Sequence, residues 1–169
     1  IIISDRDCSS ALAPIPILLA TAAVHHGLLR LKLRAQAGLV VESGEPREVM
    51  HFCLLCGYGA NAINPYLIFE MLPELQRQGE LPAGMEAGQF TDHYIAAVKK
   101  GILKVMSKMG ISTLRSYFNA QLFEAIGLNK EVVDQYFTGT GSRIEGIGLQ
   151  QIATDAIRRH QEAHQPRKP

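Results

Sequence analysis

The sequence is poor in cysteine, carries almost no net charge and has no apolar run of membrane-spanning length. Its three cysteines, an odd number at irregular spacing, do not form a disulfide framework and are typical of a reducing compartment. The formal net charge of +1 shows no bias toward polyanions. The apolar start Ile1-Ile2-Ile3 runs into Ser4-Asp5-Arg6-Asp7 rather than into a signal-peptide core. We therefore expect neither nucleic acid nor membrane as a partner, and a location in the cytoplasm or in a plastid or other organelle matrix.

What the sequence does contain is enough apolar material for one domain. Its 169 residues are 47% hydrophobic and 20% charged, the balance of a globular protein with its own core. We expect a single domain over residues 1–169, with a polar, frayed tail at 160–169. The sequence does not begin with Met, which suggests a fragment of a longer protein.

Short apolar runs alternate with longer stripes of period 3.6, the pattern of parallel strands separated by covering helices. We expect strands at residues 1–3, 38–42, 61–64 and 111–114. We expect helices at residues 17–31, 46–57, 68–75, 95–109 and 122–126, around 132–137, where Asn129 is the N-cap, and from Leu149 onward. Pro73 should kink its helix or begin a new turn, and residues 79–88 should form an exposed loop. The fold class is α/β, either an open layered sheet or part of a barrel.

Cys53 and Cys56 have the spacing of a redox pair or of half a zinc site. Both fall inside the apolar stripe of the helix at 46–57, where cysteine behaves as a small hydrophobic residue, so we favour a core role. His51, His25 and His26 could join them as ligands only if folding brought them together. A small zinc or redox protein therefore stays open as a minor alternative.

Two glycine-rich segments have a composition that is also found in phosphate-binding loops. Residues 57–62 follow a helix and precede a strand, the reverse of a dinucleotide fingerprint, so they predict a helix C-cap and a tight turn. The segment Gly139-Thr140-Gly141-Ser142-Arg143 could cradle an anion, but without a P-loop lysine a plain loop between helices is favoured. No catalytic triad, paired-carboxylate motif or nucleophile elbow is visible, so we assign no catalytic, cofactor-binding or metal residue.

Longer stretches resemble the large subunit of glutamate synthase, in the order found in that family. The resemblance begins with Ile3-Ser4-Asp5-Arg6, Ile15-Pro16, Ala22-Ala23-Val24-His25-His26, Glu42-Ser43-Gly44, Arg47-Glu48-Val49, His51-Phe52, Gly57-Tyr58-Gly59-Ala60 and Asn64-Pro65-Tyr66-Leu67. Its strongest part is residues 104–114, followed by Ser116-Tyr117, Ala120-Gln121, Phe123-Glu124-Ala125, Gly127-Leu128, Phe137-Thr138-Gly139-Thr140 and residues 142–146. Only the predicted loop at 79–88 and the tail fall outside it. The chain thus resembles the later part of that subunit's central domain.

The resemblance implies an iron-sulfur flavoenzyme that releases ammonia from L-glutamine, channels it internally and adds it to 2-oxoglutarate to make L-glutamate. It implies FMN and a 3Fe-4S cluster, but the residues that hold them, and the nucleophilic cysteine, have no counterpart here. The expected role is a scaffold between the glutamine amidotransferase and FMN-binding domains, and the isolated chain should be inactive. The competing hypothesis is a stand-alone α/β interaction or regulatory module derived from the central domain. The electron donor, ferredoxin or NAD(P)H, stays open.

The chain departs from the family pattern at two places. The family usually lacks cysteine at both Cys53 and Cys56, which strengthens their core interpretation, and Phe118-Asn119 replaces a polar residue followed by glycine. If the chain is a fragment, uncovered strand edges and apolar surface should make it self-associate.

Overall fold

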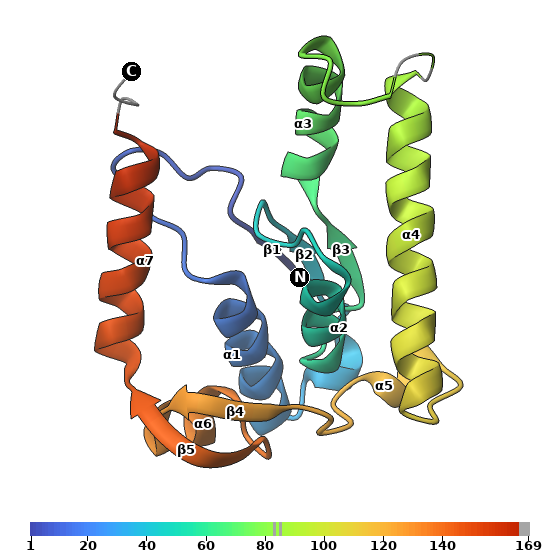
Figure 1. Cartoon of the computed structure of the whole chain (residues 1–169). Coiled ribbons are helices and arrows are strands. Elements are labelled where there is room, and N and C mark those ends of the chain that lie inside the picture. Colours follow the sequence, from blue (N-terminus) through green and yellow to red (C-terminus); the bar gives the residue numbers. More distant parts are fainter. Residues whose placement is uncertain (83, 85, 166–169) are drawn as a thin grey trace.

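The computed structural model describes residues 1–82, 84 and 86–165 and has two small sheets of parallel strands. The first sheet has the order β1 (Ile2–Ser4), β2 (Val40–Glu42) and β3 (Ala62–Asn64), with Ile2 opposite Val40 and Val40 opposite Ala62. Each of these strands lies where the apolar runs predicted it. Figure 1 shows this sheet between α7 on one side and α4 on the other, with α3 extending away from the end of β3.

The first sheet is covered by the helices that connect its strands. α1 (Ile17–Arg30) and a 3-10 turn η1 (Arg34–Gln36) lead from β1 to β2, and α2 (Val49–Gly57) leads from β2 to β3. One apolar core cluster joins sheet and helices, and consists of Ile17, Val41, Leu55 and Ala60. The predicted helices at 17–31 and 46–57 are confirmed, the second beginning three residues later than expected.

The next two helices form a pair that extends from the sheet. α3 (Tyr66–Arg77) contains Pro73 without being divided by it, and α4 (Ala87–Lys108) packs on both α3 and α2. Phe69 of α3 meets Tyr94 of α4 edge to face, with ring centroids 6.2 Å apart. α4 begins eight residues before the predicted start, so it takes in the end of the loop expected at 79–88. Residues 83 and 85 of that expected loop lie outside the described residues.

Two expectations in the middle of the chain are wrong. Residues 111–114 form no strand; Thr113 instead caps the short helix α5 (Leu114–Tyr117) by accepting a hydrogen bond from the Ser116 amide. Residues 122–126 form no helix, because Glu124–Leu128 is the strand β4. The reason is non-local: β4 finds a parallel partner in β5 (Gly141–Ile147), which local periodicity does not reveal.

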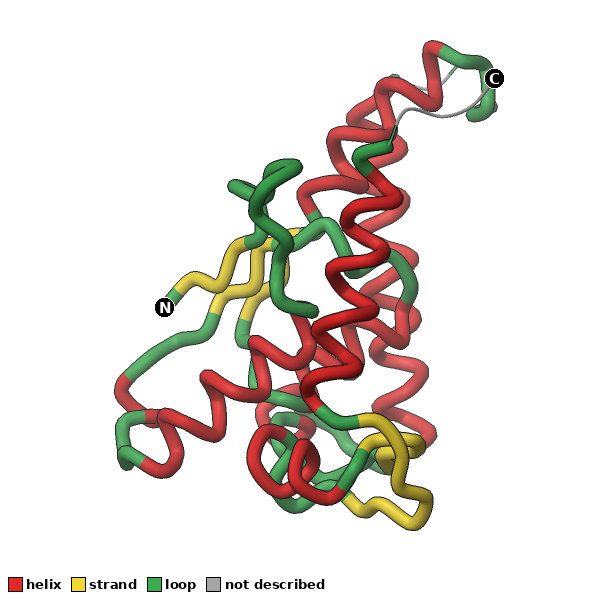
Figure 2. Tube along the Cα trace, turned by 90° about the vertical axis from the view of Figure 1, so that its left-hand side faces the viewer, coloured by secondary structure: helices red, strands yellow, loops and turns green. Residues whose placement is uncertain are grey.

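β4 and β5 are joined by α6 (Lys130–Tyr136), and α7 (Leu149–Ala163) follows β5. Asn129 caps α6 as predicted, accepting a hydrogen bond from the Val132 amide at 3.0 Å. α7 begins at the predicted residue and includes 160–163 of the expected tail; residues 166–169 lie outside the described residues. Figure 2 shows the two groups of strands well apart, with helices between them.

A second core cluster joins the β4-α6-β5 unit to the rest of the chain. It consists of Leu19, Ala22, Tyr58, Val132, Val133 and Phe137, from α1, the end of α2, α6 and the residue after α6. The Tyr58 ring meets Phe137 edge to face at 5.1 Å, and its hydroxyl lies 2.7 Å from the Thr140 hydroxyl. The α/β class with parallel strands is confirmed. Of the two arrangements left open, the structure has open sheets, and the strands described form no closed barrel.

Candidate functional site

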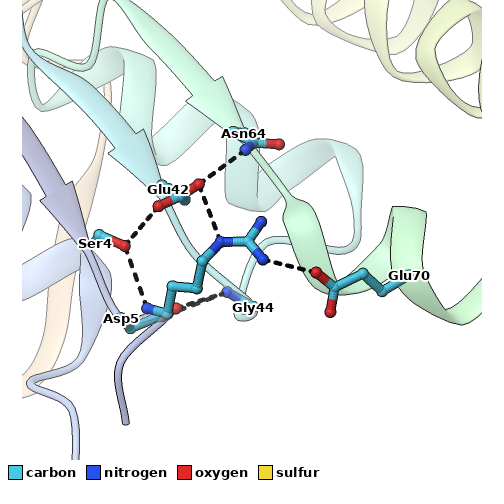
Figure 3. Close-up of polar contacts among 7 residues, drawn as sticks. Ser4, Asp5, Glu42, Gly44, Asn64 and Glu70 are labelled. Atoms are coloured by element: carbon cyan, nitrogen blue, oxygen red, sulfur yellow. Dashed lines mark hydrogen bonds and ion pairs between the residues drawn. The ribbon is translucent and has the colours of Figure 1, made fainter.

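Polar side chains collect where the three strands of the first sheet end. Ser4, Asp5 and Arg6 end or follow β1, Glu42 ends β2, and Asn64 ends β3. The carboxyl ends of parallel strands lie at one edge of a sheet, which is where open α/β folds place their ligands. This edge is therefore the expected position of a site, and Figure 3 shows its contacts.

Glu42 is the centre of this cluster. Its carboxylate accepts hydrogen bonds from the Ser4 hydroxyl at 2.7 Å, from Arg6 Nε at 3.2 Å and from Asn64 Nδ2 at 3.2 Å (Figure 3). The Ser4 hydrogen bond and the Arg6 charge hold the pKa of Glu42 below its usual value. One carboxylate thus ties together the ends of all three strands.

Arg6 extends this cluster to α3. Its Nη1 lies 2.7 Å from Glu70 Oε1, and its guanidinium carbon lies 4.1 Å from the centre of the Tyr66 ring. Asp5, the residue before it, accepts hydrogen bonds from the buried Ser43 hydroxyl at 2.5 Å and from the Gly44 amide at 3.1 Å. We call Ser4, Asp5, Arg6, Glu42, Asn64 and Glu70 the strand-end clamp.

The clamp holds the structure together rather than offering reactive groups. Each of its charged side chains is already bonded to another clamp residue or to the adjoining loop, and the Glu42 carboxylate accepts three hydrogen bonds. Within the described residues, no three His, Cys, Asp or Glu side chains are grouped so as to hold a metal ion. Its geometry suits a joint between β1, β2, β3 and α3.

The two cysteines of the CxxC segment lie in the core, as predicted. Cys53 is 0% exposed and Cys56 6%, and both pack with Met106 and Tyr117. Burial raises the pKa of Cys56 to about 11 and also raises the pKa of Cys53, which disfavours the thiolate needed for redox or metal chemistry.

The histidines are not brought to these cysteines. His25 and His26 are buried on α1, where His25 Nδ1 accepts a hydrogen bond from Arg34 Nε at 2.9 Å. His51 lies at the start of α2, and its Nδ1 accepts hydrogen bonds from the Arg47 and Glu48 amides. Folding thus places these histidines in separate local roles.

The glycine-rich segments serve backbone geometry. Gly59 has φ +105° in the turn between α2 and β3, so the predicted tight turn is confirmed. The loop expected at 139–143 is wrong in part, because residues 141–143 belong to β5 and only Gly139, with φ +85°, and Thr140 precede it. Arg143 Nε on β5 lies 3.4 Å from Glu124 Oε1 on β4, so the arginine forms an ion pair within this two-stranded sheet.

The strand-end clamp was not identified from the sequence. A usable signal existed, because polar residues follow each of the first three apolar runs directly. Since parallel strands end at the same edge, those residues had to meet once the strands paired.

No described helix is both long and apolar enough to cross a membrane.

The sequence profile of the family described as "Glutamate synthase central domain" matches residues 1–129. The chain is 48% identical over 165 residues to the glutamate synthase [NADPH] large chain of Bacillus subtilis, covering 98% of this chain and 11% of that protein. It is 47% identical to glutamate synthase [NADH] of Schizosaccharomyces pombe, covering 97% of this chain and 8% of that protein. The rice protein named ferredoxin-dependent glutamate synthase, chloroplastic, is 41% identical, with 93% of this chain and 10% of that protein covered. The chain thus spans about a tenth of these relatives.

Proposed function

This chain belongs to the glutamate synthase central domain family, and on that basis we propose that it is a connecting, non-catalytic part of a glutamate synthase. The observation that carries the proposal is similarity along 98% of the chain to a glutamate synthase large chain, with the central-domain profile matching residues 1–129.

In this proposal the complete enzyme makes L-glutamate from L-glutamine and 2-oxoglutarate, with ammonia passing between two sites inside the protein. The partners of this chain are then the glutamine amidotransferase and FMN-binding domains of the same enzyme. A scaffold that holds two sites in register raises efficiency, because an intermediate kept from bulk water is not lost. The enzyme would work in the cytoplasm or in an organelle matrix.

The cysteines of this chain do not fit the iron-sulfur cluster that the family implies. An iron-sulfur cluster needs several thiolates on one site, whereas Cys53 and Cys56 are buried in the core and Cys8 is exposed in the loop after β1. We therefore assign the 3Fe-4S cluster to another part of the enzyme, and we assign FMN to the FMN-binding domain that the family resemblance implies.

The strand-end clamp supports a scaffold role. It ties three strands and α3 together through charged and hydrogen-bonded contacts, and the cluster around Tyr58 ties the β4-α6-β5 unit to α1. Contacts of this kind hold attached parts at a set distance and angle.

The proposal is tested in the full-length enzyme by replacing Arg6 with alanine and measuring glutamate formed per glutamine hydrolysed. We expect glutamine hydrolysis to persist while less of the ammonia reaches glutamate and more is released. Lys104→Ala, on the exposed face of α4, is the matched control and should leave the ratio unchanged. Glutamate formation by the isolated chain, or FMN bound to it, would overturn the proposal. An unchanged ratio in Arg6→Ala would count against a scaffold role for the strand-end clamp.

A further inference from the structure

A pocket of 420 Å³ lies between the start of α1, α2 and the second half of α7. Its volume is within the range of small-molecule sites, roughly 300–1,000 Å³. Ile17, Leu18, Leu54 and Leu55 supply apolar lining. His160 Nε2, on α7, lies 2.7 Å from the Ser9 carbonyl oxygen and so ties α7 to the loop after β1 beside this space.

Three charged side chains line the same pocket, namely Glu45, Arg47 and Arg159. Glu45 Oε1 accepts a hydrogen bond from the Ile17 amide at 3.1 Å, and its second oxygen accepts none from the described residues. The Arg47 guanidinium has no acidic partner in the described part of the chain. Arg159 uses one nitrogen for Asp155, at 2.6 Å, and its other N–H groups contact no described acceptor. Donors and an acceptor thus remain available for a ligand.

Glu45 and Arg159 are close enough for the charge of one to act on the other. Withdrawal from bulk water raises the pKa of Glu45, and the charge of Asp5 adds to that rise, while the hydrogen bond from the Ile17 amide and the charge of Arg159 act against it. His51 also lines the pocket, and its Nδ1 is occupied by two backbone amides, so its Nε2 carries the proton as a further donor. The lining therefore combines two guanidinium groups and one carboxylate around an apolar surface.

The complement of two cations and one anion is a small molecule with two carboxylates and one ammonium group. Guanidinium groups bind carboxylates through paired hydrogen bonds, and a carboxylate binds an ammonium group through charge-assisted hydrogen bonds. We propose that this pocket binds an acidic α-amino acid, with Arg47 and Arg159 on its two carboxylates and Glu45 on its ammonium group. This inference does not depend on the proposed function. It concerns ligand binding by the pocket, whereas the proposed function concerns the connection between the catalytic domains of the enzyme.

The test is isothermal titration of the 169-residue chain with three probes of similar size. L-glutamate carries all three charges, glutarate lacks the ammonium group, and L-glutamine lacks one carboxylate. We expect L-glutamate to bind at least about tenfold more tightly than either, since one unmatched charged hydrogen bond is worth about that factor. Glu45→Gln should bring L-glutamate down to the affinity of glutarate. Arg159→Ala should weaken L-glutamate binding, and Arg159→Lys should weaken it less.

Arg158→Ala is the matched control, because Arg158 is adjacent on α7 but does not line the pocket. It should bind L-glutamate as the unmodified chain does, with circular dichroism verifying that every variant is folded. The proposal is overturned if the folded chain shows no saturable L-glutamate binding or binds glutarate equally well. Equal weakening by Arg158→Ala and Arg159→Ala would overturn it too. None of these outcomes tests the proposed connecting function, which is tested separately by the glutamate formed per glutamine hydrolysed in the full-length enzyme.

Discussion

His25 Nδ1 accepts a hydrogen bond from Arg34 Nε at 2.9 Å, and this contact joins the middle of α1 to the turn before β2. Arg34 also donates to the Ala37 and Gly59 carbonyl oxygens at 2.6 and 2.7 Å. A protonated His25 could not accept from Arg34, so the contact requires the neutral imidazole.

The first prediction follows from this requirement. Burial, with the charges of His26 and Arg34, lowers the pKa of His25 to about 4, against 6.5 in the unfolded chain. The unfolded state thus takes up the proton first, and the stabilisation present above pH 6.5 is lost as the pH falls toward 4. We expect the free energy of unfolding to drop by roughly 2 kcal/mol between pH 7 and pH 5, measured by urea denaturation. His25→Asn, whose side-chain oxygen can still accept from Arg34, should flatten this dependence, whereas exposed His93→Ala should not.

The second prediction concerns Gly59, whose φ is +105° and where a Cβ would lie 2.1 Å from His25 Nδ1. Gly59→Ala should destabilise the chain by on the order of 2–4 kcal/mol, because it combines backbone strain with a clash in the core. Gly27→Ala is the control: nothing lies within 4 Å of its Cβ position on α1, so it should be neutral or stabilise slightly. Thermal unfolding distinguishes them, and equal melting temperatures would contradict the prediction.

The third prediction addresses Asp5, which accepts hydrogen bonds from the Ser43 hydroxyl and the Gly44 amide. Asp5→Ala leaves the fully buried Ser43 hydroxyl without this partner, which typically costs about 1–3 kcal/mol. Asp7→Ala, two residues later and exposed, should change the free energy of unfolding far less. Chemical denaturation of both variants measures the difference.

The fourth prediction concerns thiol reactivity. Cys8 is exposed, whereas Cys53 and Cys56 are buried, so the native chain should show one fast thiol and two that react only on unfolding. Cys8→Ser should remove the fast phase without affecting the slow one. Rapid labelling of Cys53 and Cys56 in the native protein, or stoichiometric zinc in the purified chain, would contradict a core role for them.

The fifth prediction concerns self-association. β1 is an edge strand, and Ile1 and Ile2 are 55% and 69% exposed. Unpaired strand edges with apolar side chains pair with other chains, so light scattering over a dilution series should show concentration-dependent association. Ile2→Lys should reduce it, because charge on an edge strand opposes pairing. A monodisperse monomer at high concentration, with sharp cooperative unfolding, would argue for a self-contained module.

Much of the fold was predictable because its first half follows local rules. The strands at Ile2–Ser4, Val40–Glu42 and Ala62–Asn64 are short apolar runs between turn residues, and the helices between them carry clear stripes. Burial of Cys53 and Cys56 followed from their place on such a stripe. The turn at Gly59 followed from a glycine between a helix and a strand.

By itself, then, the sequence determined the α/β class, most helices and the family. The period of its apolar residues indicates the strands and helices, and stretches that match the family occur in the family's order. Tertiary structure alone decided that residues 124–128 are a strand, since their partner is β5 on the far side of α6. It also decided which side chains meet: Arg6 with Glu42 and Glu70, and His25 with Arg34. These pairs lie 9 to 64 residues apart, and such contacts form only when paired strands and packed helices bring distant segments together.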